Sequence, residues 1–84
     1  MVVKRYHIDV MPELGILAAN VKRLRQSRGL TQKQLSVKAN VSTAIISGIE
    51  NGTGNPSILT VLFLAEALGV APGEFLIDHN NTND

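Results

Sequence analysis

Apolar residues recur every three to four positions along most of this chain, which predicts a series of helices. The first predicted helix covers residues 12–28, and Gly29 stops it. A second is expected to begin at Thr31, because Thr31 and Gln34 have the spacing of a capping box. It ends at Asn40, since Asn enters the left-handed conformation of a tight helix exit more readily than most residues. The positions expected to face the core are Leu14, Leu17, Val21, Leu24, Leu35 and Ala39.

Ser42 is suited to cap a third helix, which the Asn-Gly pair at residues 51–52 stops. The turn between the second and third helices, residues 40–42, is short enough to force a sharp crossing. With Ile46 at the centre of the inward face, helical geometry divides the helix into two faces. The inward set also contains Ser42, Ile45 and Ile49, and the outward set contains Thr43, Ala44, Ser47, Gly48 and Asn51. Gly48 costs about 1 kcal/mol against alanine inside a helix, which suggests close approach of another surface.

A fourth helix is predicted over residues 58–68, and a short fifth one over residues 73–76 with Pro72 at its first position. The fourth is apolar on nearly every side, a composition typical of a helix that is buried all round. Its core face is assigned to Ile58, Val61, Leu64, Ala65 and Leu68. Leu59 and Phe63 point elsewhere, so they predict a contact surface, and a symmetric dimer is its simplest explanation.

Residues 2–10 alternate between apolar and polar side chains with few exceptions, which is the period of a strand. Tyr6 and Ile8 belong to the apolar side. Because no other segment offers a partner strand, two interpretations remain: a β-strand that pairs with its own copy in a dimer interface, or a flexible arm. The predicted organisation is an arm or strand at 1–11, a helical domain at 12–77 and a disordered polar tail at 78–84.

The net charge of the 84 residues is only +1, but the charges are unevenly distributed. Residues 1–38 hold all eight basic residues and two acidic ones, whereas residues 39–84 hold five acidic residues and no basic one. The two parts therefore carry +6 and −5. This division predicts one electropositive face, although a chance arrangement of solvated charges gives the same totals.

The composition also argues against several classes of protein. No apolar run reaches the roughly 18 residues of a membrane span, and the N-terminus lacks the apolar core of a secretory signal, so a cytoplasmic protein is expected. The absence of cysteine excludes disulfides and cysteine-based zinc sites. His7 with Asp9 is a weak metal signal, and a surface histidine is the favoured interpretation. Since both histidines, His7 and His79, lie in terminal segments, we predict no enzyme, no metal site and no cofactor.

Four segments of the chain resemble the helix-turn-helix domain of the XRE family, which is typified by Cro and the phage lysogeny repressors. They are VKRLRQSRGLTQKQLS, ANVSTAIISGIENG, NPSILTVLFLAEALGV and PGEFL, and the span covers about 60 of the 84 residues. The resemblance implies an all-α, five-helix, phage-repressor-like domain. It also implies binding to double-stranded DNA, usually as a homodimer on paired half-sites.

The resemblance implies roles for individual residues as well. The positions that match base contacts are Thr43, Ala44 and Gly48, with Ser47 beside them. Gln32 matches a residue that touches phosphate and often the outermost base, and Asn51 with the following loop matches phosphate contacts. Lys33 and the helix N-termini at Thr31 and Ser42 are expected to add phosphate contacts. Arg25 and Glu50 match an ion pair that ties the first helix to the third.

The chain departs from the family pattern where DNA would be read. The base-reading side chains are small where relatives commonly carry Gln, Arg, Lys or Asn, and the loop at 53–55 is neutral. The third helix therefore lacks the bidentate base contacts that discriminate by about 1–3 kcal/mol. Specificity is expected to rest on DNA shape and thymine-methyl contacts, and affinity on phosphate contacts that include the basic end of the first helix.

The expected function is a sequence-specific transcriptional regulator, with repression favoured, that binds operator DNA as a homodimer and is nucleoid-associated when bound. Without an effector domain, occupancy and dimer concentration would set its effect. Two alternatives stay open. One is an antitoxin or similar protein whose Leu59 and Phe63 surface meets a toxin or a regulator. The other is an interaction module of the same fold that has lost DNA binding.

Overall fold

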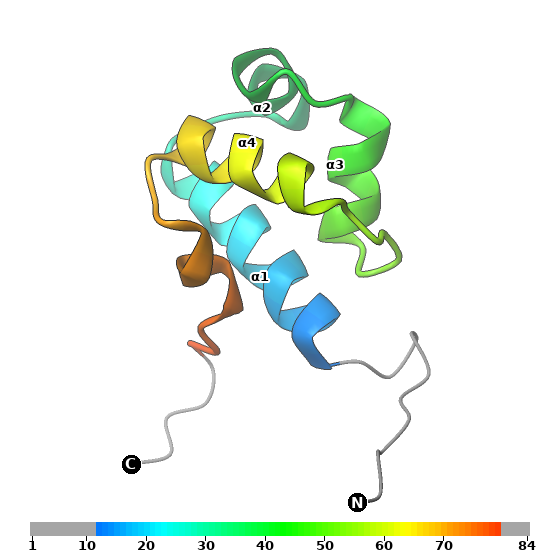
Figure 1. Ribbon diagram of the computed structural model, residues 1–84. Helices are drawn as coiled ribbons and strands as arrows, with labels where there is room; N and C mark the ends of the chain where they lie inside the picture. The colour runs from blue at the N-terminus through cyan, green and yellow to red at the C-terminus, as the bar shows by residue number, and fades with distance from the viewer. Residues whose placement is uncertain (1–11, 80–84) are drawn as a thin grey trace, which may run out of the picture.

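The computed structural model describes residues 12–79, which form a helical bundle (Figure 1). Its elements are the α-helices α1 (Pro12–Ser27), α2 (Gln32–Ala39), α3 (Thr43–Glu50) and α4 (Ile58–Leu68), and the 3₁₀ helix η2 (Pro72–Leu76). In Figure 1, α2 lies at the top of the molecule and α3 at its right, with α4 across the middle. The four predicted α-helices are confirmed, and no strand occurs within residues 12–79.

The prediction of five helices is wrong for the last one, because η2 is a 3₁₀ helix. It spans only five residues, and the amide of Glu74 donates to the carbonyl of Ala71 at 2.9 Å, three residues earlier. A segment this short that opens on a proline has little room for α-type turns. The strand or arm predicted at 1–11, with Tyr6 and Ile8, lies outside the described residues.

Helix boundaries follow from local signals in the sequence. The predicted capping box is confirmed at the start of α2: the amide of Gln34 donates to Thr31 Oγ1 at 3.0 Å, and the amide of Thr31 donates to Gln34 Oε1 at 2.8 Å. Asn40 ends α2 in the left-handed conformation, with a φ of 57°. Ser42 then caps α3 by accepting a hydrogen bond from the amide of Ile45 at 3.1 Å. The tight turn at residues 40–42 is therefore present as predicted.

The core is a single cluster to which every helix contributes. Its buried members are Leu17, Val21, Leu24, Leu35, Ala39, Val41, Ile46, Ile49, Leu64, Ala65, Ala67, Leu68 and Phe75. Helix α1 packs against α3 and η2, and α2 packs against α3 and α4. This arrangement holds α2 and α3 as one rigid unit.

Three residues assigned to the core are exposed instead. Ile45 is 45% exposed, because it lies on the side of α3 that faces the loop at 52–57 rather than α1 and α2. Ile58 is 74% exposed, since it is the first residue of α4 and the buried side of that helix begins one turn later. Ser42 is exposed as well, in keeping with its capping role.

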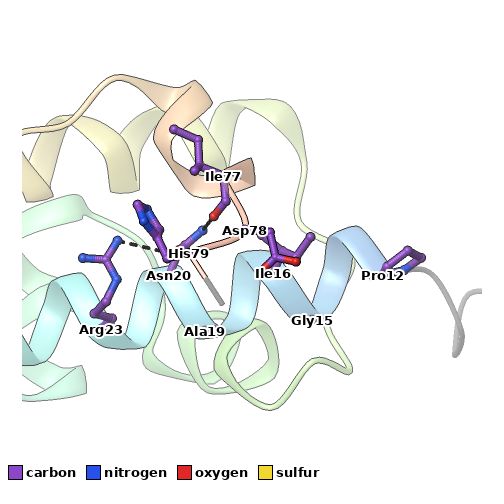
Figure 2. Close-up of a pocket in the computed structure, with 9 residues that line it drawn as sticks. All are labelled: Pro12, Gly15, Ile16, Ala19, Asn20, Arg23, Ile77, Asp78 and His79. Atoms are coloured by element: carbon purple, nitrogen blue, oxygen red, sulfur yellow. Dashed lines mark hydrogen bonds between the residues drawn. The ribbon is translucent and has the colours of Figure 1, made fainter. Parts of the chain in front are cut away.

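A buried side chain that the apolar pattern did not reveal fastens η2 to α1. The amide nitrogen of Asn20, a residue only 3% exposed, donates to the carbonyls of Phe75 and Ile77 at 2.8 Å each. Figure 2 shows the contact with Ile77. It also lies 3.4 Å from the carbonyl of Glu74. This contact closes the bundle at the end away from α2 and places the Phe75 ring in the core.

Candidate nucleic-acid interface

An ion pair between α1 and α3 is the centre of the site. Arg25 Nε lies 2.7 Å from Glu50 Oε2 and Arg25 Nη2 lies 2.9 Å from Glu50 Oε1, so the pair is bidentate. The side chains are 12% and 3% exposed. Arg25 Nη1 also donates to the carbonyl of Leu30 at 2.8 Å, in the turn before α2. One guanidinium therefore joins α1, the start of α2 and the end of α3, as the sequence predicted for the pair itself.

Gln32 completes this cluster from the first turn of α2. Its Nε2 donates to Glu50 Oε1 at 3.1 Å. Because a carboxylate only accepts hydrogen bonds, the amide nitrogen and not the amide oxygen must face Glu50. No motif in the sequence indicated this contact, which joins residues 18 positions apart.

The cluster shifts the pKa values of both charged members. Burial by itself raises the pKa of Glu50, but hydrogen bonds from Arg25 and Gln32, together with the charges of Arg25 and Lys22, lower it by more. The pKa of this carboxyl therefore lies below its usual value. The hydrogen bonds that Arg25 donates to Glu50 raise the pKa of Arg25 above its usual value. The pair is ionised at neutral pH and locks α3 against α1.

The residues predicted to face outward on α3 are all at least partly exposed to solvent. Thr43, Ala44 and Asn51 are exposed, and Ser47 and Gly48 are half-buried. Thr43, Ser47 and Glu50 are four and three residues apart, so they lie on one side of the helix. Gln32 contacts this side at Glu50. The hydrogen bond between Gln32 and Glu50 thus places the N-terminus of α2 beside the end of α3.

The surface that approaches Gly48 is the chain's own loop. The Gly48 carbonyl accepts hydrogen bonds from the amides of Thr53 at 3.1 Å and Gly54 at 2.8 Å. A Cβ at Gly54 would lie 2.9 Å from the Gly48 carbonyl carbon, whereas a Cβ at Gly48 would lie 3.6 Å from the Gly54 Cα. The close approach predicted at Gly48 therefore exists, and Gly54 is the residue that makes it possible. The loop covers α3 beside Gly48, whereas Thr43 and Ala44 in the first turn are exposed.

Two arginines at the end of α1 and just after it are engaged within the protein. Arg25 is paired with Glu50, and Arg28 Nε donates to the carbonyl of Leu68 at 2.9 Å, at the end of α4. Lys22, Arg23, Arg28, Lys33 and Lys38 are exposed at the surface.

Helix α4 presents an apolar strip on the outside of the bundle. Leu59 is 56% exposed and Phe63 is 38% exposed, as predicted for residues that do not serve the core. Leu62 belongs to the same strip and is 44% exposed. Leu62 was not among the residues predicted for this surface, although Leu62 lies three residues after Leu59 and therefore on the same side of the helix.

One pocket lies beside the outer side of α3, and a second lies elsewhere in the described part of the chain. One, of about 330 Å³, lies between α3 and the loop after it and is lined in part by Ala44, Ile45 and Thr60. The other, of about 520 Å³, lies between the first half of α1 and residues 77–79, away from α2 and α3 (Figure 2). Within residues 12–79 no group of three or more His, Asp or Glu side chains is placed to hold a metal ion. No helix in that range is long and apolar enough to cross a membrane.

The helix-turn-helix family HTH_3 matches residues 21–75, which contain α2, α3 and α4, the C-terminal part of α1 and most of η2. The chain belongs to the XRE-type helix-turn-helix family. Its similarity to curated relatives agrees with this. The uncharacterized HTH-type transcriptional regulator y4dJ of Sinorhizobium fredii is 34% identical over 67 residues, which make up 80% of this chain and 87% of that protein. The immunity repressor of Bacillus phage phi105 is 44% identical over 50 residues, or 60% of this chain and 35% of the repressor.

Solved structures of the helix-turn-helix family have the same fold. The restriction-modification controller protein C.AhdI from Aeromonas hydrophila superimposes with a TM-score of 0.73 at 29% identity, covering 77% of this chain and 98% of the controller. The hypothetical transcription factor NHTF from Neisseria gives a TM-score of 0.77 at 21% identity, covering 95% of this chain and 90% of that protein. At this identity the similarity shows only that the two proteins share a fold.

Proposed function

We propose that this helix-turn-helix protein is a sequence-specific transcriptional regulator, and more narrowly a repressor, that occupies operator DNA. The observation that carries the proposal is the cluster of Arg25, Gln32 and Glu50, which fixes α2 and α3 as one rigid surface. A protein that reads DNA gains from such rigidity, because little conformational freedom is lost on binding. The names of the relatives, which are regulators and a phage repressor, support the same function.

In this proposal the outer side of α3 enters the major groove. Thr43 and Ala44, both exposed in the first turn, pack against thymine methyls, and the hydroxyl of Thr43 or Ser47 makes a single hydrogen bond to a base. Ser47, half-buried, and Gly48, beneath the loop, lie at the inner edge of the contact. The short side chains allow the helix backbone to approach the bases closely.

Phosphate groups are bound around this helix. Lys33 supplies a charge in the first turn of α2, and Asn51 lies at the end of α3. The N-termini of both helices, beginning at Thr31 and Ser42, present the positive ends of their dipoles to the backbone. Specificity then depends on DNA shape and deformability as well as on base contacts.

We propose further that the protein acts as a homodimer through the strip of Leu59, Leu62 and Phe63. Three large apolar side chains on one exposed helix face are an unusual surface for a small monomer. A symmetric contact would place two copies of α3 side by side, as paired half-sites require. The alternative occupant of this strip is an unlike protein, such as a toxin, and purification with a second chain would favour it.

Selection of bound sites from random-sequence DNA at two salt concentrations tests the proposal. We expect enriched sites with a two-fold repeat whose half-site centres lie about one helical turn, or a multiple of it, apart. Binding without any enriched sequence at either salt concentration would overturn sequence-specific regulation. Enrichment of single half-sites would instead support sequence-specific DNA binding and contradict binding as a homodimer.

A further inference from the structure

The pocket between the first half of α1 and residues 77–79 is a groove that runs along the helix, here called the α1 groove. Its volume of about 520 Å³ lies in the range of clefts that bind a ligand. Along α1 the groove is lined by Pro12, Gly15 and Ile16 before its first charged residue, Arg23, and Ile77 lines the opposite side (Figure 2). Ile77 is 48% exposed and Ile16 is half-buried. The groove therefore leaves apolar surface in contact with water.

The amide that lines this groove is already satisfied. Asn20 is only 3% exposed, and its Nδ2 donates to the carbonyls of Phe75 and Ile77. At the other end of the amide, Arg23 Nη2 donates to Asn20 Oδ1 at 3.4 Å. An occupant of the groove is not needed to complete these hydrogen bonds. Apolar side chains gain most in such a place, because they leave water and cover apolar surface.

Two segments of the chain continue from the ends of the groove, and only one has apolar side chains to fill it. Residues 80–84 follow His79, which lines the groove, but their sequence NNTND is polar throughout. Residues 1–11 precede Pro12, which also lines the groove. They include the segment 2–10 with its alternation of apolar and polar side chains. The N-terminal segment is therefore the occupant whose chemistry fits.

The lengths of the segment and of the groove agree. From Pro12 to Arg23, α1 rises by about 16 Å at 1.5 Å per residue. An extended segment from Tyr6 to Val10 covers about 13 Å at 3.3 Å per residue. A step of two residues in this segment, about 6.6 Å, nearly equals a step of four residues on the helix, about 6 Å. Side chains on one side of the segment therefore stay in register with one side of α1.

The register follows from the point at which the segment joins the helix. Because Val10 stands two positions before Pro12, a segment that turns back along α1 brings Val10 to the first turns, near Gly15. A Cβ at Gly15 would meet no atom within 4 Å, so there is room for another side chain. Tyr6 then falls at Arg23, and a guanidinium stacks favourably on an aromatic ring.

We propose that residues 6–10 occupy the α1 groove of their own chain as an extended segment, with Ile8 against Ile77. Asn20 donates to the carbonyl of Ile77, so Ile77 is level with the part of the groove to which the register brings Ile8. The polar side of the segment, which includes His7, faces solvent. The segment then covers the bundle on the side away from α2 and α3 instead of pairing with a second copy. The inference is independent of the proposed DNA-binding function.

Disulfide trapping in the full chain tests the proposal, because the sequence contains no cysteine. The pair of substitutions Ile8→Cys and Ile77→Cys is compared with the pair His7→Cys and Ile77→Cys. At equilibrium with oxidised and reduced glutathione, the disulfide content found by mass spectrometry gives the effective concentration of the two thiols. A flexible arm gives both pairs nearly the same value, since the loops that they close differ by one residue. We expect a value at least about ten-fold higher for the Ile8 pair, because only that side chain faces the groove.

A third substitution in the Ile8 pair shows whether the groove itself is responsible. Gly15→Trp places a large side chain in the groove and should reduce the effective concentration to that of the His7 pair. Glu13→Trp is the matched control, since Glu13 is exposed in the same part of α1 and does not line the groove, and it should leave the value unchanged. Circular dichroism verifies that each variant retains its helices.

The outcomes separate the possible positions of the segment. A disulfide within one chain that favours Ile8 over His7 and is lost in Gly15→Trp supports the proposal. Equal effective concentrations for the two pairs would overturn it and indicate a flexible arm. A preference that survives Gly15→Trp would place the segment outside the groove. A disulfide between two chains, seen as a covalent dimer on a non-reducing gel, would assign the groove to a second copy and overturn the proposal as well. None of these results depends on DNA, so the proposed function can fail or stand separately.

Discussion

At the scale of single residues, the site depends on two glycines whose roles differ although they touch. Gly54 approaches α3 so closely that any side chain would meet the backbone of Gly48 and Ile49 at 2.9 Å. Gly48 has ordinary contact distance around it, at 3.6 Å to the nearest atom. The sequence drew attention to Gly48 because glycine is unfavourable inside a helix. It gave no reason to single out Gly54, because a close approach is visible only in three dimensions.

The first prediction compares these glycines. Gly54→Ala should destabilise the protein by about 1–3 kcal/mol, because its Cβ overlaps backbone atoms that have little freedom to move. Gly48→Ala should be neutral or stabilise by up to about 1 kcal/mol, since alanine favours helix and the space is sufficient. Urea denaturation of both variants measures the difference. Equal effects of the two substitutions would contradict the close packing of the loop on α3.

The second prediction concerns the pH dependence of the buried ion pair. The pKa of Glu50 is lowered in the folded protein, so the carboxylate contributes stability above the ordinary value of 4.5 and loses it as the pH falls through the lowered pKa. Glu50→Gln should therefore be less stable than wild type at pH 7, by about 3 kcal/mol if Arg25 is left unpaired. The gap should narrow as the pH falls below about 4. Denaturation curves of both proteins at several pH values measure this difference in the free energy of unfolding. A difference that stays constant with pH would show that the ionisation of Glu50 does not contribute to stability.

At the scale of elements, the boundaries of the helices could be predicted because their causes are local. Thr31, Asn40 and Ser42 each cap or end a helix within a few residues of their own position, and each acts as the sequence indicated. The 3₁₀ character of η2 was not predicted, since it depends on how a short segment meets α1.

The faces of the helices were less predictable than their ends. Ile45 and Ile58 were assigned inward from periodicity, but burial depends on which neighbours lie beside a helix and how far they extend. The contact between Gln32 and Glu50 was missed for a related reason. Its partners are 18 residues apart on different helices, and a polar side chain gives no periodic signal.

The third prediction tests the attachment of η2 to α1. Asn20→Leu keeps a similar volume but leaves the carbonyls of Phe75 and Ile77 without a donor in a buried site. We expect a loss of about 2 kcal/mol or more in the free energy of unfolding. Ala19→Leu, an exposed neighbour on the same helix, is the control and should change stability little. Equal stability of Asn20→Leu and wild type would show that the amide contributes nothing to closing the bundle.

At the scale of the whole molecule, two surfaces of different character are exposed. The N-terminus of α2 and the outer side of α3 form a polar surface, and α4 carries the apolar strip of Leu59, Leu62 and Phe63. The sequence predicted the existence of both. It overstated the contribution of Arg25 to the first, because that guanidinium is paired with Glu50.

The fourth prediction addresses the apolar strip. Phe63→Glu should shift the protein toward monomer in sedimentation equilibrium and weaken binding to paired half-sites, because a charge in the interface opposes association. The side chain is 38% exposed in the single chain, so the fold should persist in circular dichroism. Val37→Glu, at an exposed apolar position on α2, is the matched control and should leave the oligomeric state unchanged. A Phe63→Glu protein that sediments like wild type would place the dimer contact elsewhere.

The measurement that tests the central claim most directly is the salt dependence of DNA binding. With the duplex recovered by selection, log K should fall linearly with log salt concentration, by about 0.9 for each phosphate neutralised. Lys33→Ala should bind more weakly at every salt concentration and with a slope reduced by about 1 for each DNA-bound copy. Binding that is absent, or that is unchanged by salt and by the loss of Lys33, would contradict the account of α2 and α3 as a DNA-reading surface.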